Sequence, residues 1–170
     1  MAIPSLAQSL VVLGLVPAAL AIVIATDLVG RVIPNIVLIL LVAGFAALAV
    51  TGTVPDLALR VMLACGALAL GFALFAQDVI GAGDAKLAAV IALWLDPGQL
   101  PVFALICGLL GGLLVAAVTL RARWQRAAPP RSARLAAHML DLAPSLPYGV
   151  ALAGAALCLL PASTLVATLT

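Results

Sequence analysis

Residues 100–120 read LPVFALICGLLGGLLVAAVTL, an uncharged apolar run with the length of roughly 20 residues that a membrane crossing needs. Similar runs recur along a chain of 170 residues that is 66% hydrophobic and 8% charged, with a mean hydropathy of +1.36. Soluble domains are about a quarter charged, so this composition indicates an integral membrane protein, with a single domain covering residues 1–170. The runs are rich in Leu and Ala and do not alternate, which favours helices over a β-barrel.

We therefore expect an all-α polytopic membrane protein. Its apolar runs predict about six transmembrane helices, at residues 10–26, 33–50, 57–76, 79–95, 100–120 and 147–166. The fourth run is the weakest, because only residues 87–95 of it are uninterrupted and apolar. This helix can span the membrane only if the preceding segment GAGDAK, residues 81–86, is itself partly inside.

The basic residues predict the orientation, because Lys and Arg concentrate in short cytoplasmic loops. A basic cytoplasmic loop is expected at residues 121–145, where it also attracts anionic lipid. Counting helices from that loop puts Arg31 and Lys86 on the same side and leaves Arg60 on the outer side. Both termini are then expected outside. The loop contains five arginines: Arg121, Arg123, Arg126, Arg131 and Arg134.

All six acidic residues are aspartates, and the topology separates them into two groups. Asp56 and Asp96 fall in short outer loops beside Pro and Gly, where Asp commonly serves as a turn or cap residue. The other four are expected on the cytoplasmic side: Asp27, Asp78, Asp84 and Asp141.

Asp27 ends the first predicted helix in ATDLVGRVIPN, residues 25–35, and Asp84 begins the fourth in GAGDAK. Both carboxyls are therefore expected at similar depth on one side of the membrane, where they can meet. Two close carboxyls can share a proton, so that one activates water while the other polarises a peptide carbonyl. Gly81 and Gly83 leave room for a bend and for an extended peptide. This is the chemistry of an aspartic protease.

Other interpretations remain open from the residues alone. Asp84 follows glycine at the start of a helix, as an N-cap residue does, and Asp27 precedes Gly30 and Pro34, as an interfacial turn residue does. Paired aspartates in a membrane also occur in small proton- or ion-coupled transporters. In a third class, a non-catalytic assembly factor for a pilus or secretion system, the aspartates would only cap helices.

The position of each aspartate in its own helix suggests which one carries the shared proton. A helix N-terminus favours negative charge and a C-terminus disfavours it. On this argument Asp84 is the resting carboxylate and Asp27 is the proton-bearing partner.

Three segments together resemble the short type IV prepilin peptidases that serve Flp, or tight-adherence, pili: TDLVGRVIPN (26–35), GAGDAKL (81–87) and PYGVALA (147–153). The resemblance covers about residues 25–154. It implies a GxGD-type aspartic endopeptidase of the bacterial inner membrane, which removes a short basic leader after a glycine on the cytoplasmic side. It maps the family's catalytic aspartates onto Asp27 and Asp84, and the glycines of its GxGD motif onto Gly81 and Gly83. Arg31, Pro34 and Asn35 are implied to support the loop of the first aspartate.

The resemblance also implies the partners and the absence of cofactors. The expected partners are a prepilin or pseudopilin substrate, the lipid bilayer and possible further copies of the chain, with no nucleic acid. Asp78 is expected to contact positive charge on the leader, and Lys86 to pair with a carboxylate or a lipid phosphate. Longer relatives insert a CxxC-containing methyltransferase domain after the first helix, whereas this chain passes directly from Asp27 to Ile33. We therefore expect no metal and no methylation.

Overall fold

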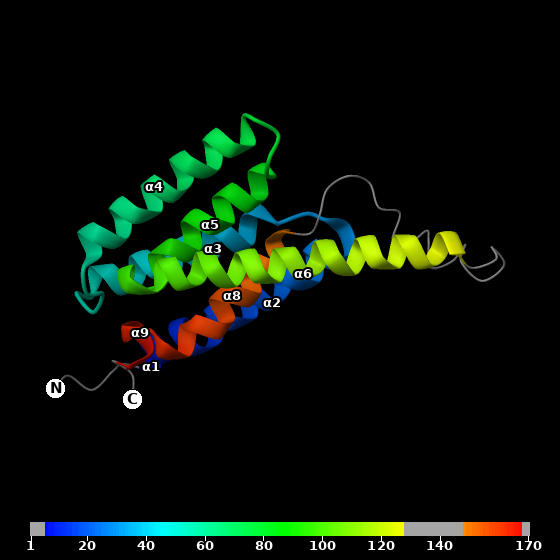
Figure 1. Cartoon of the computed structure of the whole chain (residues 1–170). Coiled ribbons are helices and arrows are strands. Elements are labelled where there is room, and N and C mark those ends of the chain that lie inside the picture. Colours follow the sequence, from blue (N-terminus) through cyan, green and yellow to red (C-terminus); the bar gives the residue numbers. More distant parts are fainter. Residues whose placement is uncertain (1–5, 128–147, 168–170) are drawn as a thin grey trace.

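A computed structural model describes residues 6–127 and 148–167, and Figure 1 shows that the regular elements of these residues are helices. The first long helix is continuous, passing from α1 (Leu6–Ser9) through the π-helical turn η1 (Leu10–Leu15) into α2 (Val16–Gly30). The remaining elements are α3 (Asn35–Val50), α4 (Leu57–Phe75), α5 (Ala82–Trp94), η2 (Pro97–Gln99), α6 (Leu100–Ala127), α8 (Tyr148–Leu159), η3 (Leu160–Ala162) and α9 (Thr164–Ala167).

Helices therefore occur at all six predicted places, but they differ in length. Four stretches are long and apolar enough to cross a membrane, namely Leu6–Gly30, Leu57–Phe75, Pro97–Ala117 and Tyr148–Ala167, while α3 is a shorter apolar helix. The 13 residues of α5 reach only about 20 Å, less than the roughly 30 Å of a bilayer core. The helices support a polytopic membrane protein, and six crossings remain a prediction.

The first residues of the predicted basic loop are helical. α6 does not end near residue 120 but continues to Ala127, so residues 121–127 are helical. Arg is a good helix former, and a helix that reaches the membrane surface has no reason to stop at the first charged residue. Residues 128–145, with Arg131, Arg134 and Asp141, lie outside the described part of the chain.

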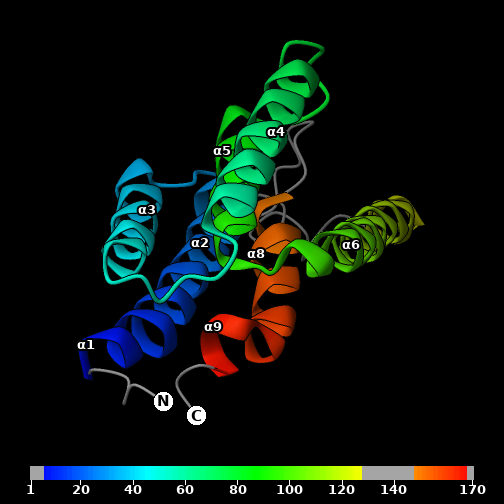
Figure 2. The ribbon, with the colours of Figure 1, turned by 90° about the vertical axis from the view of Figure 1, so that its left-hand side faces the viewer.

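α5 lies inside the helical bundle. It packs against α4, α3 and α8, while α2 packs against α8 and α3, and α6 lies at the edge against α8 (Figure 2). Leu87, Ile91 and Trp94 of α5 are buried, and the Trp94 ring meets the ring of Phe45 edge-on at 5.6 Å. α5 begins in an exposed glycine-rich turn at residues 81–82, and most of its later residues are buried.

Different helix ends and loops gather at the two ends of the bundle. Near one end, both figures place α1, α9 and the turn between α3 and α4. The loops α2–α3 and α4–α5 lie toward the other end. At that end Arg31 closes α2 in the left-handed conformation, with φ of 52°, and its N–H donates to the Asp27 carbonyl at 3.1 Å. Pro34 then starts α3 in an extended conformation.

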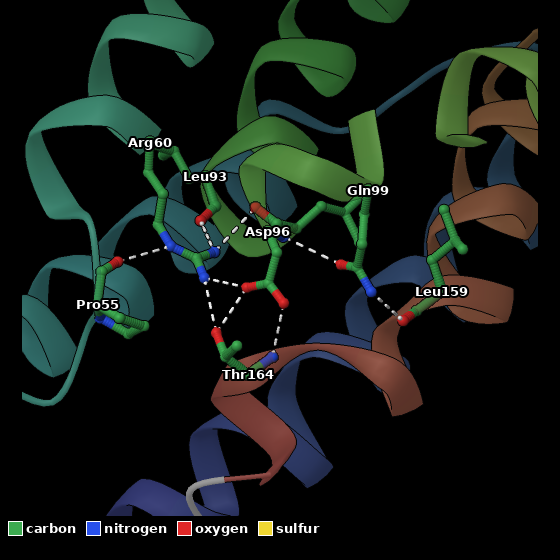
Figure 3. Close-up of polar contacts among 8 residues, drawn as sticks. Pro55, Arg60, Leu93, Asp96, Gln99, Leu159 and Thr164 are labelled. Carbon is green, nitrogen blue, oxygen red and sulfur yellow. Dashed lines mark hydrogen bonds and ion pairs between the residues drawn. The ribbon is translucent and has the colours of Figure 1, made fainter. Parts of the chain in front are cut away.

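A buried arginine organises the first of these ends (Figure 3). Arg60 has only 1% of its surface exposed, and its five N–H groups are all directed at acceptors. The acceptors come from three regions of the chain: the carbonyls of Pro55, Leu93 and Leu95 at 2.9, 3.2 and 2.8 Å, the Asp96 carboxylate, and the Thr164 hydroxyl at 3.0 Å. Arg60 is therefore an internal ion-pair partner, and not the outer-surface charge that the orientation argument counted.

Asp56 and Asp96, the aspartates expected in short loops, occupy a turn and a cap position, and Asp96 also makes an ion pair. Asp56 precedes α4 in the left-handed conformation. The carboxylate of Asp96 accepts hydrogen bonds from the backbone and hydroxyl of Thr164 at 2.8 and 2.6 Å, in addition to its pair with Arg60. Partial burial would raise the pKa of Asp96, but the Thr164 and Arg60 contacts outweigh it and hold the pKa below the ordinary value of 3.8. No local pattern in the sequence predicts this ion pair, because Arg60 and Asp96 lie far apart along the chain.

Removal of the arginine should destabilise the bundle. We expect Arg60→Met to lower the free energy of unfolding by about 3 kcal/mol, because Asp96 and three carbonyls lose their donors in a buried setting. Denaturant unfolding in detergent micelles, followed by circular dichroism, measures this loss. The double variant Arg60→Met/Asp96→Asn should recover part of it, and the exposed Met62→Ala on the same helix serves as a control. A single-variant effect below about 0.5 kcal/mol would contradict the role of Arg60.

Gly71 brings α4 close to the first turn of α5. A Cβ atom at Gly71 would lie 2.8 Å from the Ala85 Cβ and 3.0 Å from its Cα, so a larger residue must push the helices apart. We expect Gly71→Val to cost about 2 kcal/mol of unfolding free energy through overpacking. Gly66→Val on the same helix is the matched control, since no atom lies within 4 Å of its Cβ position. Equal unfolding midpoints for the two variants would show that the close approach is unimportant.

Candidate active site

A pocket of about 680 Å³ opens where the α2–α3 loop, the α4–α5 loop and the first turns of α5 and α8 meet. It contains eight of the nine residues selected from the sequence: Asp27, Arg31, Asn35, Asp78, Gly81, Gly83, Asp84 and Lys86. Pro34 is not among its lining residues and instead borders an apolar groove beside Val29 and Gly30. Residues from three separate parts of the sequence are thus brought to one concave surface.

Asp27 lies in the last turn of α2 and has only 4% of its surface exposed. Its Oδ2 accepts a hydrogen bond from the backbone N–H of Val150, at 3.0 Å, in the first turn of α8. The first N–H groups of a helix have no acceptor within that helix, so this donor is available to the carboxylate. Asp27 is therefore more than a turn residue, because it joins α2 to α8.

Asp84 is the third residue of α5, not its N-cap. Gly81 occupies the cap position in an extended conformation, and its N–H donates to Oδ2 of Asp84 at 3.3 Å. A Cβ at Gly81 would lie 3.0 Å from that same oxygen, so glycine at this position gives the carboxylate room. Asp84 is more accessible than Asp27 and faces the pocket.

Ile33 packs between α5, which carries Asp84, and α8, which contacts Asp27. Ile33 of the α2–α3 loop lies against Gly83 on α5, where an added Cβ would be 3.4 Å away, and against Gly149 on α8, where it would be 3.0 Å away. The carboxyls are close enough for the charge of Asp27 to act on Asp84. The glycines on both sides of Ile33 allow the loop to close in, which brings the carboxyls to the same pocket.

The charged and polar residues around Asp27 and Asp84 differ in their contacts. Arg31 is near enough for its charge to act on Asp27. Lys86 donates a long hydrogen bond, 3.4 Å, to Oδ1 of Asn35, and thereby links α5 to the start of α3. Its partner here is an amide, where a carboxylate or lipid phosphate was expected. Asp78 is exposed in the α4–α5 loop and adopts the left-handed conformation, with φ of 56°.

Sequence reasoning missed the contribution of α8. Tyr148 lines the pocket, Gly149 lies against Asp27, and Val150 donates to it. The segment PYGVALA was noted only as part of a resemblance, because no local pattern shows which distant carboxylate a helix start will meet. The signal available was a glycine in the first turn of a helix, where alanine would be a better helix former.

The sequence model of the type IV leader peptidase family matches residues 14–116, which is more than half of the chain and includes both Asp27 and Asp84. No curated protein and no solved structure matches the chain. The family's name describes a peptidase of leader sequences, and the apolar helices agree with a membrane location. The chain belongs to the type IV leader peptidase family.

Proposed function

We propose that this chain is a membrane aspartic endopeptidase that cleaves the short leader of type IV prepilins of the Flp type, after a glycine. The observation that supports this most directly is the single pocket lined by Asp27 and Asp84, which lie on different helices. Family membership implies a leader peptidase, and the aspartate pair supplies a mechanism for it.

The proposed reaction is hydrolysis of one peptide bond. One aspartate, ionised, takes a proton from a water molecule whose oxygen attacks the scissile carbonyl carbon. The other aspartate, protonated, gives its proton to the carbonyl oxygen, so that a neutral diol forms. When the diol collapses, the C–N bond breaks, the leaving nitrogen takes a proton from one aspartate, and the other aspartate takes a proton from a diol hydroxyl, so the dyad ends with one proton as it began. Water is consumed, and a carboxyl end and an amine are produced.

The walls of the pocket suit an extended peptide. Gly81, Ala82 and Gly83 form one side and carry almost no side chain, so a substrate backbone can approach closely. Asp78 lies on the same wall, where we propose that it attracts the basic residues of the leader. We propose that a membrane-anchored prepilin enters here with its leader unfolded.

The basic residues around the pocket support access of the substrate from the cytoplasm. The pocket is lined by Arg31 and Lys86, and basic residues favour the cytoplasmic side. Arg60, the one basic residue that opposed this orientation, is buried in an ion pair and so carries no weight in the count. We propose a bacterial inner-membrane protein with its active site toward the cytoplasm and both termini outside.

Replacement of either aspartate should abolish cleavage. Co-expression with a Flp-type prepilin, followed by a gel-shift assay of membranes, should show shortening by the wild type and a loss of about a hundredfold or more in Asp27→Asn and Asp84→Asn. Asparagine can still accept the helix-end hydrogen bonds, so a purely capping role would survive both changes. Asp56→Asn is the matched control, because it lies in a turn and does not line the pocket.

The outcomes separate the classes of function. Cleavage that persists in either variant would exclude a catalytic dyad. If wild-type membranes cut none of a panel of prepilins, a transporter or a non-catalytic assembly factor becomes the better interpretation of the aspartates.

A further inference from the structure

The first turn of α8 holds the carboxylate of Asp27. The Val150 N–H donates to Oδ2 at 3.0 Å, across a sequence separation of 123 residues. The side chain of Asp27 is almost fully buried, so this contact is made away from bulk water. A hydrogen bond from a helix N-terminus stabilises a negative charge more than a neutral carboxyl.

Gly149 makes this contact possible. A Cβ at this position would lie 2.9 Å from Oδ2 and 3.1 Å from Cγ of Asp27, and 3.0 Å from Cδ1 of Ile33. Any side chain would displace either the carboxylate or the loop that carries Ile33. Glycine is unfavourable inside a helix by about 1 kcal/mol relative to alanine, so its presence in the first turn calls for a local reason. Space for the Asp27 carboxylate supplies that reason.

Most of the other polar groups near Asp27 would stabilise a negative charge on its carboxylate. Arg31 acts on it from the turn that follows α2, and Tyr148 and Lys86 line the same pocket. Asp84, from α5, is the group that opposes the charge. Within residues 6–127 and 148–167, the helix-end donor to Asp84 is the Gly81 N–H of its own helix, at the longer distance of 3.3 Å. The better-placed and more deeply buried donor thus belongs to Asp27.

We propose that the first turn of α8 positions Asp27 as the resting carboxylate that activates water, and that Asp84 bears the shared proton. Gly149 and Val150 are positioning residues in this scheme, and the assignment reverses the one obtained from each aspartate's own helix. It rests on the proposed function for its catalytic meaning. The contact between α8 and Asp27 stands independently of that function.

Proline at residue 150 tests the donor directly. Val150→Pro removes the N–H while a proline remains tolerated in the first turn of a helix, and Val150→Ala removes the same side chain but keeps the N–H. With a cleaved prepilin as probe, we expect Val150→Pro to lower kcat about tenfold or more with KM within about twofold, and Val150→Ala to cleave like the wild type. The acid limb of the pH–activity profile should move up by about one pH unit in Val150→Pro and stay in place in Val150→Ala.

Alanine at residue 149 is a second test that does not depend on proline. Gly149→Ala should show the same fall in kcat and the same displacement of the acid limb. Gly154→Ala on the same helix should show neither, because its Cβ would make an ordinary contact of 3.5 Å with Leu110. If both Val150→Pro and Gly149→Ala keep the wild-type pH profile, or move the acid limb down, the assignment is overturned while the protease function stands.

Infrared spectroscopy distinguishes failure of this proposal from failure of the proposed function. In Asp84→Asn protein, the carboxylate band that disappears on further replacement of Asp27 reports the environment of Asp27. That band should shift in Val150→Pro and Gly149→Ala and stay in place in Val150→Ala and Gly154→Ala, even if no prepilin is ever cut. An unshifted band in the first two variants would show that α8 does not hold the carboxylate.

Discussion

The structure depends on the guanidinium group of Arg60, because it fixes the far end of the helix that carries Asp84. Its N–H groups bind the last carbonyls of α5, the Asp96 carboxylate and the hydroxyl of Thr164 on α9. These acceptors come from segments that would otherwise have unpaired polar groups inside an apolar bundle, which lipid cannot satisfy. A short, buried α5 can therefore keep a fixed position without the length of a full membrane crossing.

At the other end of α5, close packing at glycines adds to the hydrogen bonds between elements. Gly71 lets α4 lie against Ala85, and Gly83 and Gly149 let the α2–α3 loop come in between α5 and α8. A Cβ atom at Gly71 or Gly149 would lie 3.0 Å or less from its nearest neighbours, whereas at Gly83 it would make an ordinary contact of 3.4 Å with Ile33, so the first two glycines hold their elements closest. Carboxylates that must share a proton need this kind of fixed support.

The sequence predicted the helices and most of the candidate site because both depend on local information. Apolar runs locate helices, and short motifs carry Asp27 and Asp84 with their neighbours. The features it missed depend on what a residue meets far away in the chain. Arg60 looks like any arginine near the end of a membrane helix until its partner Asp96 is known, and the extension of α6 beyond residue 120 is hidden because arginine suits both helix and loop.

The proposal of which aspartate bears the shared proton also depends on contacts that the local sequence does not show. The position of Asp27 at the end of α2 suggests an unfavourable place for a negative charge, because only the dipole of its own helix is visible in the sequence. Folding brings the start of α8 to the same carboxylate, with a donor 3.0 Å away. The partial charge of that second helix has the opposite sign and is in direct contact. Where two helix ends meet at one buried carboxylate, the end that supplies the hydrogen bond favours the ionised form.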